Sequence, residues 1–295
     1  MSDPFGATVF RKTLLAPGIY FVATPIGSAR DITLRGLDIL ASAEVIAAED
    51  TRTARRLMEL HGVPVDGRRM IAYHDHSSAS ARDGLLKLAA ESSVAYVSEA
   101  GTPLVADPGF QLGRAAAEQG IAVTTAPGPS AALAALTLSG LPSDRFTFAG
   151  FPPHAGASRK RFLEGLAGSD GTVILFESPK RIKGTLTELC EIAGQDRPAA
   201  LARELTKKFE EVRRGTLSEL LKSVNDAPPK GEIVLLIGRA DVQEADPEAI
   251  DEALRAAMAG MRVKDAAAEV AEIFGKPRRE MYQRALELGR ENGSD

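Results

Sequence analysis

Between residues 18 and 150, strand-like apolar segments alternate with helix-length segments, and this alternation limits the possible folds more than any other feature of the sequence. Strands are predicted within 18–27, 44–51, 69–76, 94–101 and 121–128, and helices from about residue 33, at 51–62 and at about 79–91, 109–119 and 130–139. Repeated strand–helix–strand units favour a parallel sheet with helical crossovers. We therefore expect an α/β domain here.

Three of the predicted strands run directly into loops rich in glycine, proline and small polar residues. These loops are FVATPIG (21–27), YVSEAGTPLVADPG (96–109) and TTAPGPS (124–130). Gly101 and Gly109 allow a close backbone approach, and Glu99 and Asp107 offer acceptors for ribose hydroxyls or a cationic group. Each loop alone could be a simple connection, but together they predict one ligand at the carboxyl edge of the sheet. None matches G-x-G-x-x-G or a P-loop.

The rest of the chain divides into further segments. Pro152 and Pro153 end the last strand of the first domain, and a smaller mixed α/β segment follows. Three short helical patterns near the C-terminus resemble a helix-turn-helix, although an acidic helical cap without a nucleic-acid role is an equal alternative. The predicted order is an N-terminal extension at 1–17, a first α/β domain at 18–151, a second at 152–240, a linker at 241–247 and a helical domain at 248–295.

Charge and cysteine content exclude several classes of protein. The net charge is −4, but residues 151–240 carry 15 Lys and Arg against 12 Asp and Glu, so this segment alone is basic. Cys190 is the single cysteine, which excludes an internal disulfide framework. The longest apolar runs have strand length and the N-terminus lacks a signal-peptide core, so we expect a cytoplasmic protein without a membrane partner.

A metal site is not expected. The four histidines are His61, His74, His76 and His154. His74 and His76 would share one side of a strand, but the further ligands that zinc needs are missing from the pattern. We therefore favour substrate contact or a structural role for this pair.

Taken in order, the motifs resemble those of a known enzyme family. They are VATPIG, DITLRGLDIL, AAEDTRTARRL, YHDH, SEAGTPLVADPG, APGPSA, SGLP, GFPP, FESPKR, ARELTK and KGEIVLL. The series is similar to that of the bacterial small-subunit rRNA cytidine 2′-O-methyltransferases within the tetrapyrrole-methylase superfamily, over about residues 18–240. Two motifs depart from the family pattern: Ser28 and Ala29 replace an Asn-Leu pair in the first, and Glu99 replaces an aspartate in the second.

The resemblance implies a fold, a cofactor and an assembly. It implies two α/β domains that enclose a cleft for S-adenosylmethionine, a C-terminal helix-turn-helix-like domain, a homodimer, and 16S rRNA of the small ribosomal subunit as substrate. The residues implied for cofactor binding are Pro25, Ile26, Gly27, Glu99, Ala100, Gly101, Thr102, Pro103, Pro127, Ser130, Ala131, Glu177, Ser178, Ala202 and Ile233.

Catalysis and RNA binding then need further polar residues. A ribose hydroxyl is a poor nucleophile, so we expect Glu204 or Asp50 to accept its proton and Arg203 and Lys207 to hold phosphate or oxyanion. An ion-pair network that only orders the cleft is an equal alternative. The cations expected to bind RNA phosphates are Arg52, Arg159, Arg161, Lys180 and Arg181.

Two other functions remain open from the sequence. Methylation of a tetrapyrrole would use the same cleft and cofactor. A DNA-binding protein that senses S-adenosylmethionine would use the helix-turn-helix and the cofactor pocket. The basic second domain disfavours the first of these, and the reactive polar groups in AEDTR and ARELTK disfavour the second.

Overall fold

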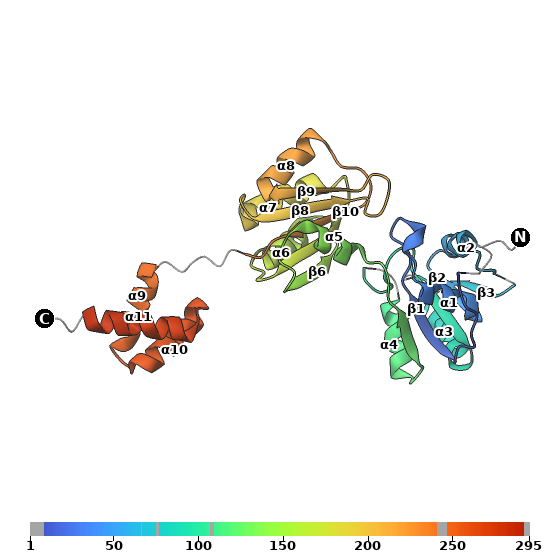
Figure 1. The fold of residues 1–295 in the computed structure, drawn as a ribbon, viewed down its shortest axis with the longest axis horizontal. Helices are drawn as coiled ribbons and strands as arrows, with labels where there is room; N and C mark the ends of the chain where they lie inside the picture. The colour runs from blue at the N-terminus through green and yellow to red at the C-terminus, as the bar shows by residue number, and fades with distance from the viewer. Residues whose placement is uncertain (1–8, 66, 75–76, 107–108, 241–246, 292–295) are drawn as a thin grey trace, which may run out of the picture. The chain divides into compact units, whose positions relative to one another are not determined.

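The computed structural model describes residues 9–65, 67–74, 77–106, 109–240 and 247–291 (Figure 1). Asp107, Pro108, His76 and most of the predicted linker lie outside the described residues. The chain forms two compact units, Met1–Arg239 and Ala240–Asp295. The larger unit contains two five-stranded sheets, and each is described below with the helices that cover it.

The first sheet is parallel throughout its described strands, as the alternating pattern predicts. Its strands are β1 (Gly18–Val22), β2 (Val45–Ala48), β3 (Arg69–Ala72), β4 (Ser93–Val97) and β5 (Val123–Ala126), in the order β3-β2-β4-β1-β5. The helical segments that follow them are η1 (Ala29–Asp31), α1 (Leu34–Ser42), α2 (Thr51–Leu60), α3 (Ala79–Glu91), α4 (Phe110–Glu118) and α5 (Ala131–Ser139). Strand β3 ends at Ala72, so the prediction that His74 lies within a strand was wrong.

Alternate residues of the first sheet pack into two separate cores. Val22 and Ala95 face a core that includes α1 and α2, whereas Ile19 and Tyr96 face a core that includes α3 and α4. Both faces of the sheet are thus covered, as expected for parallel strands. Apolar side chains hold the strands in register, and the loops at the strand ends remain available for a ligand.

The second sheet is mainly antiparallel. Its strands are β6 (Phe146–Gly150), β7 (Thr172–Glu177), β8 (Pro198–Arg203), β9 (Glu211–Thr216) and β10 (Ile233–Ile237), in the order β6-β7-β10-β8-β9, with only the β6–β7 pair parallel. The helices of this segment are α6 (Gly156–Ala167), α7 (Ile182–Ala193) and α8 (Leu217–Asp226).

Strand β10 shows how the second sheet is covered. Ile233, Leu235 and Ile237 pack on the side of α6, α7 and α8, while Val234 and Leu236 pack against α5. Helix α5 directly follows β5 of the first sheet in sequence, yet its buried side chains pack on a face of the second sheet. This placement brings the β5 loop to the second sheet.

The smaller unit contains three helices, α9 (Pro247–Met258), α10 (Val263–Phe274) and α11 (Arg278–Glu291). Their buried side chains, including Leu254, Val270 and Leu288, form a core of their own. Gly275 ends α10 in the left-handed conformation, with φ of 62°, which glycine adopts without steric cost. The short turn before α11 is the one that the helix-turn-helix pattern predicts.

Candidate functional site: a cavity between loops of the two sheets

Three loops meet at the carboxyl edge of the first sheet because their strands are neighbours. Strand β1 pairs with β4 on one side and β5 on the other, and all three run in the same direction. Thr24 and Gly101 exchange two backbone hydrogen bonds, with N–O distances of 2.8 and 3.0 Å. The Thr102 hydroxyl donates to the Pro129 carbonyl at 2.9 Å. The predicted meeting of the three loops is confirmed.

A cavity of about 210 Å³ lies where these loops face the second sheet. Its lining combines apolar residues with backbone groups, and the charged residues in it are two glutamates. The lining residues are Ile26, Ala100, Gly101, Thr102, Val105, Ala106, Ser130, Ala131, Phe151, Phe176, Glu177, Glu232, Ile233 and Val234. No cation among the described residues lines this cavity.

The register of the second sheet explains why distant residues meet in the cavity. Ile233 is paired with Glu177 of β7 on one side and with Arg203 of β8 on the other. The first residue of β10 therefore adjoins the last residues of both neighbouring strands. Phe176 also packs edge-to-face against Phe151, with ring centroids 5.4 Å apart, and this contact forms an apolar wall.

Glu177 is a buried carboxylate on the cavity wall. Its side chain is completely inaccessible to solvent. It accepts hydrogen bonds from the Thr185 hydroxyl at 2.6 Å and from the Ser178 backbone N–H at 2.8 Å. The guanidinium groups of Arg181 and Arg159 lie 3.4 and 3.9 Å from its oxygens. This environment compensates the buried charge, as a buried carboxylate requires.

Lys207, Glu204 and Glu232 form an ion-pair cluster beside the cavity. The Lys207 ammonium lies 3.1 Å from Glu204 and 2.9 Å from Glu232. Hydrogen bonds from the Glu232 backbone and from Lys207 hold the pKa of the Glu204 carboxyl below its ordinary value. Burial acts to lower the pKa of Lys207, but hydrogen bonds to Glu232 and Glu204 outweigh it and raise the pKa. Both groups are therefore charged near neutral pH.

The β8–β9 loop also contacts the β1 loop. The Ser28 backbone N–H donates to the Thr206 hydroxyl at 2.9 Å. A Cβ atom added to Gly27 would lie 2.6 Å from Lys207 Cγ and 2.8 Å from the Leu205 carbonyl oxygen. Only glycine fits this contact without displacement of the neighbouring backbone.

Backbone strain is concentrated in two loops at the cavity. Four described non-glycine residues have positive φ: Leu104 (73°), Ala106 (58°), Glu204 (51°) and Thr206 (62°). The first two lie in the β4–α4 loop and the others in the β8–β9 loop. Strained residues of this kind persist where the surroundings determine them and are frequent at ligand sites.

The remaining predicted catalytic residues lie in different settings. Arg203 donates to Glu211 at 2.6 Å and to the Lys230 carbonyl at 3.2 Å, and its charge helps to lower the pKa of the neighbouring Glu204. Asp50 caps the N-terminus of α2 by accepting from the Arg52 backbone N–H. Hydrogen bonds from Arg52 lower the pKa of Asp50 to about 2. Asp50 is thus engaged in a local helix cap and ion pair.

Two of the predicted RNA-binding cations are committed to internal contacts. Arg159 is buried, and it donates to Glu188, Thr185 and the Pro153 carbonyl. Arg181 donates to the carbonyl groups of Pro152 and Pro153 and lies beside Glu177. These internal contacts leave the Arg159 side chain only 8% exposed, so contact of Arg159 with RNA stays a prediction. Arg52, Arg161 and Lys180 are exposed.

Eight of the predicted cofactor residues line the cavity, and seven do not. Those outside the lining are Pro25, Gly27, Glu99, Pro103, Pro127, Ser178 and Ala202. Ala202 is buried beneath α5, and Glu99 is exposed, its backbone N–H 3.4 Å from Glu49. The lining also contains six residues that were not predicted: Val105, Ala106, Phe151, Phe176, Glu232 and Val234. All six belong to the motifs SEAGTPLVADPG, GFPP, FESPKR and KGEIVLL, and this was the sequence signal that could have identified them.

The histidines do not form a cluster in the described part of the chain. His61 contacts the Ala29 carbonyl at 2.9 Å. Within residues 9–65, 67–74, 77–106, 109–240 and 247–291, no three His, Cys, Asp or Glu side chains gather as a metal site would require. None of the described helices is long and apolar enough to span a membrane.

Comparisons with known proteins agree with this architecture. Residues 18–221 match the family Tetrapyrrole (Corrin/Porphyrin) Methylases, and residues 244–289 match the RsmI C-terminal HTH domain. The chain is 46% identical to Ribosomal RNA small subunit methyltransferase I of Mesorhizobium japonicum, over 96% of each chain. It is 40% identical to the protein of the same name from Escherichia coli O157:H7, over 91% of this chain and 94% of the relative.

A solved structure shows the same fold at low sequence identity. It is the uroporphyrin-III C-methyltransferase from Thermus thermophilus complexed with S-adenyl homocysteine, which is 19% identical, with a TM-score of 0.54. The match covers 76% of this chain and 98% of that one. The predicted combination of two α/β domains with a C-terminal helical domain is confirmed.

Proposed function

Because the chain belongs to the ribosomal RNA small subunit methyltransferase I family, within the tetrapyrrole methylases, we propose that it methylates a ribose 2′-hydroxyl of a cytidine in 16S rRNA. The methyl donor is S-adenosylmethionine. The single observation that carries this proposal is the cavity at the edge of β1, β4 and β5, whose charged lining consists of glutamates.

The cavity offers polar groups and an apolar wall to a cofactor. S-adenosylmethionine supplies an electrophilic methyl group on a sulfonium, and it also carries an ammonium group. Arg181 and Lys207 already pair with Glu177 and Glu232, and the backbone groups near Gly101 and Ser130 provide donors and acceptors. The volume of about 210 Å³ is smaller than the ~300–1,000 Å³ typical of ligand sites. The cofactor would therefore extend beyond the cavity along the loops.

We assign the cofactor contacts in two groups. The residues that line the cavity would touch the bound molecule directly: Ile26, Ala100, Gly101, Thr102, Ser130, Ala131, Glu177 and Ile233. The other predicted residues would support these loops or contact the part of the cofactor outside the cavity: Pro25, Gly27, Glu99, Pro103, Pro127, Ser178 and Ala202.

The ion-pair cluster supplies the groups that the transfer needs. The ribose oxygen forms a bond to the methyl carbon as the sulfur–carbon bond breaks, and the hydroxyl proton must leave. The oxygen becomes strongly acidic as it is alkylated, so the ionised Glu204 is a competent acceptor although its pKa is lowered. Lys207 holds Glu204 in place and offers a positive charge to a nearby phosphate. Asp50 and Arg203 then serve to order the adjacent loops.

The exposed cations and one exposed aromatic residue define the proposed RNA contacts. Arg52, Arg161 and Lys180 would bind phosphates, since their side chains face solvent. Phe209 follows Lys207 in the β8–β9 loop, is 62% exposed, and has the Lys208 ammonium 5.5 Å from its ring centroid. An exposed ring next to a cation suits stacking with an unpaired base.

The proposed setting is the cytoplasm, with the protein as a homodimer. Ribosomal subunits are the substrate, which supports the location. Helix α5 packs on the second sheet through Ala132, Ala135 and Leu136, while Leu133 on the same helix is 51% exposed. A single exposed apolar residue is ordinary on a protein surface, so the homodimer is proposed from the family resemblance.

The test uses purified full-length protein, labelled S-adenosylmethionine and small subunits that lack their native methylation. We expect label on a cytidine ribose, located by nuclease digestion and mass spectrometry. Lys207→Met should reduce transfer strongly, whereas Lys222→Met, an exposed lysine on α8, should not. Absence of label on the subunits, with cofactor binding demonstrated separately, would refute the proposal.

A further inference from the structure

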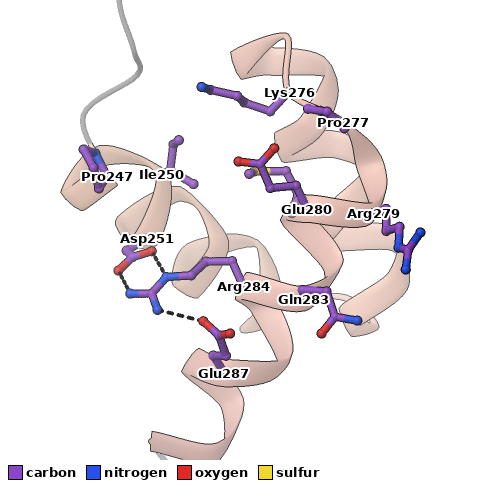
Figure 2. A pocket seen from close by; sticks show the side chains of 11 residues that line it. Pro247, Ile250, Asp251, Lys276, Pro277, Arg279, Glu280, Gln283, Arg284 and Glu287 are labelled. Atoms are coloured by element: carbon purple, nitrogen blue, oxygen red, sulfur yellow. Dashed lines mark hydrogen bonds and ion pairs between the residues drawn. The ribbon is translucent and has the colours of Figure 1, made fainter.

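The three-helix unit has two hollows that differ sharply in charge. One, of about 690 Å³, is lined by residues of α9, α11 and the turn before α11 (Figure 2). Its lining contains Lys276, Arg279 and Arg284 but also Asp251, Glu280 and Glu287. Arg284 donates to Asp251 at 2.8 Å and to Glu287 at 3.0 Å, as the dashed lines in Figure 2 mark. This hollow carries three cations and three carboxylates, and Arg284 is paired with two of the carboxylates.

The second hollow, of about 410 Å³, lies between α10 and α11. It is lined by Lys264, Ala267 and Ala268 of α10 and by Arg278, Arg279 and Tyr282 of α11. Three cations and an aromatic ring therefore surround a floor of small alanines, and no carboxylate from the described part of the chain lines it. Figure 2 shows the Arg279 side chain directed away from the Asp251–Arg284 pair.

The cations of this α10–α11 hollow are not neutralised within the protein. Lys264, Arg278 and Arg279 are exposed, and none has an ion-pair partner within residues 247–289 or elsewhere in the described chain. Residues 241–295 carry 8 Lys and Arg against 13 Asp and Glu, a net charge of −5. A cluster of unpaired cations without acids is therefore a local exception in an acidic unit, and it favours a polyanionic partner.

Tyr282 indicates which polyanion fits. Its side chain is 39% exposed at the edge of the hollow. A tyrosine ring stacks well on an unpaired base, and the adjacent cations would hold the phosphates on either side of that base. Bases in a duplex are already stacked on each other and do not present a free face to such a ring.

We propose that the α10–α11 hollow binds single-stranded RNA, with one base on Tyr282 and phosphates at Lys264, Arg278 and Arg279. The identification of the strand as RNA rests on the proposed function of the larger unit. The hollow is then a second RNA contact, separate from the methyl-transfer cavity in sequence and in chemistry.

The test compares two variants of the full chain with equal loss of charge. One is Lys264→Gln/Arg278→Gln/Arg279→Gln; the matched control is Arg255→Gln/Arg262→Gln/Lys276→Gln, whose cations lie outside the hollow. Binding of a labelled single-stranded RNA of about 12 nucleotides is measured by fluorescence anisotropy at several salt concentrations. The hollow variant should lose about 2 units of slope in log affinity against log salt. The control should keep most of the parent slope.

Tyr282 is tested by a conservative and a disruptive change. Tyr282→Phe should bind like the parent, and Tyr282→Ala should bind about 5-fold or more weakly. Circular dichroism checks that each variant retains its helices, and the charge variants decide the matter if Tyr282→Ala unfolds.

Several outcomes would overturn the inference. These are equal losses in both charge variants, an unchanged slope in the hollow variant, or tighter binding of the parent to a DNA duplex of the same sequence. RNA binding is measured without methyl transfer. If the hollow variant loses RNA affinity but the parent protein does not methylate the subunits, only the proposed function is refuted and the RNA contact at the hollow stands.

Discussion

Replacement of Arg159 by methionine should destabilise the larger unit strongly. The Arg159 side chain is 8% exposed and its neighbour Glu177 is fully buried. Arg159 donates to Glu188 at 2.9 Å, to Thr185 at 2.8 Å and to the Pro153 carbonyl at 3.2 Å. Methionine fills a similar volume but satisfies none of these acceptors. Removal of one partner from a buried charged network costs about 3–5 kcal/mol, a large share of the ~5–15 kcal/mol that stabilises a typical protein.

Urea unfolding followed by circular dichroism measures this loss. With an m-value of about 3 kcal/mol/M, a loss of 3 kcal/mol lowers the unfolding midpoint by about 1 M. The matched control is Arg161→Met on the same helix. Arg161 is exposed and, among the described residues, donates only to the Ala157 carbonyl at 3.3 Å, so its replacement should change stability by less than about 0.5 kcal/mol.

The same two variants test whether Arg159 acts inside the fold or binds RNA, as the sequence predicts. If Arg159 bound an RNA phosphate, Arg159→Met would unfold like the parent protein and would lose about 0.7 units of salt slope in RNA binding. That result would refute the internal role assigned to Arg159. A lowered urea midpoint with an unchanged salt slope in the folded protein would support it.

Two further changes probe the β8–β9 loop. Gly27→Ala should force the loop to shift because the new Cβ would meet the Leu205 carbonyl at 2.8 Å. The ~1–3 kcal/mol of overpacking should lower kcat/KM by about 5- to 150-fold. The control Gly165→Ala, whose new Cβ meets no atom within 4 Å, should keep full activity. Because the pKa of Glu204 is lowered in the folded protein, its ionised form stabilises the fold above pH ~4.5 and this contribution disappears as the pH falls further. The difference in urea midpoint between Glu204→Gln and the parent should therefore shrink below that pH; an unchanged difference, or the same behaviour in the control Glu91→Gln, would contradict the role of the ion pair.

The fold was predictable because the strands carry periodic apolar patterns. In IVLLI of β10, every residue is buried, and alternate residues enter opposite cores. The three loop motifs at the ends of β1, β4 and β5 were predictable for the same reason, since adjacent parallel strands end at one edge. Strand β3 was predicted too long, because the buried Tyr73 extends its apolar pattern past the last paired residue, Ala72.

The site was harder to predict because its residues are brought together by pairing between strands that are far apart in sequence. Ile233 joins Glu177 and Arg203 only through the pairing of β10 with both neighbours, and nothing local to KGEIVLL specifies those partners. The three residues of the basic run Arg159-Lys160-Arg161 differ in burial: the first side chain is buried and the other two are exposed. The helical spacing indicates which one is buried, since Arg159 lies four residues before the buried Leu163 and thus on the same helix face.

The central position of β10 has a consequence for how the protein is synthesised. In the order β6-β7-β10-β8-β9, the strand that leaves the ribosome last fills the middle of the second sheet. Until residues 233–237 emerge, β7 and β8 each have an unpaired edge, and such edges promote aggregation. A nascent chain halted before β10 would therefore present two unpaired strand edges and no completed cavity, so the site can form only after β10 has emerged.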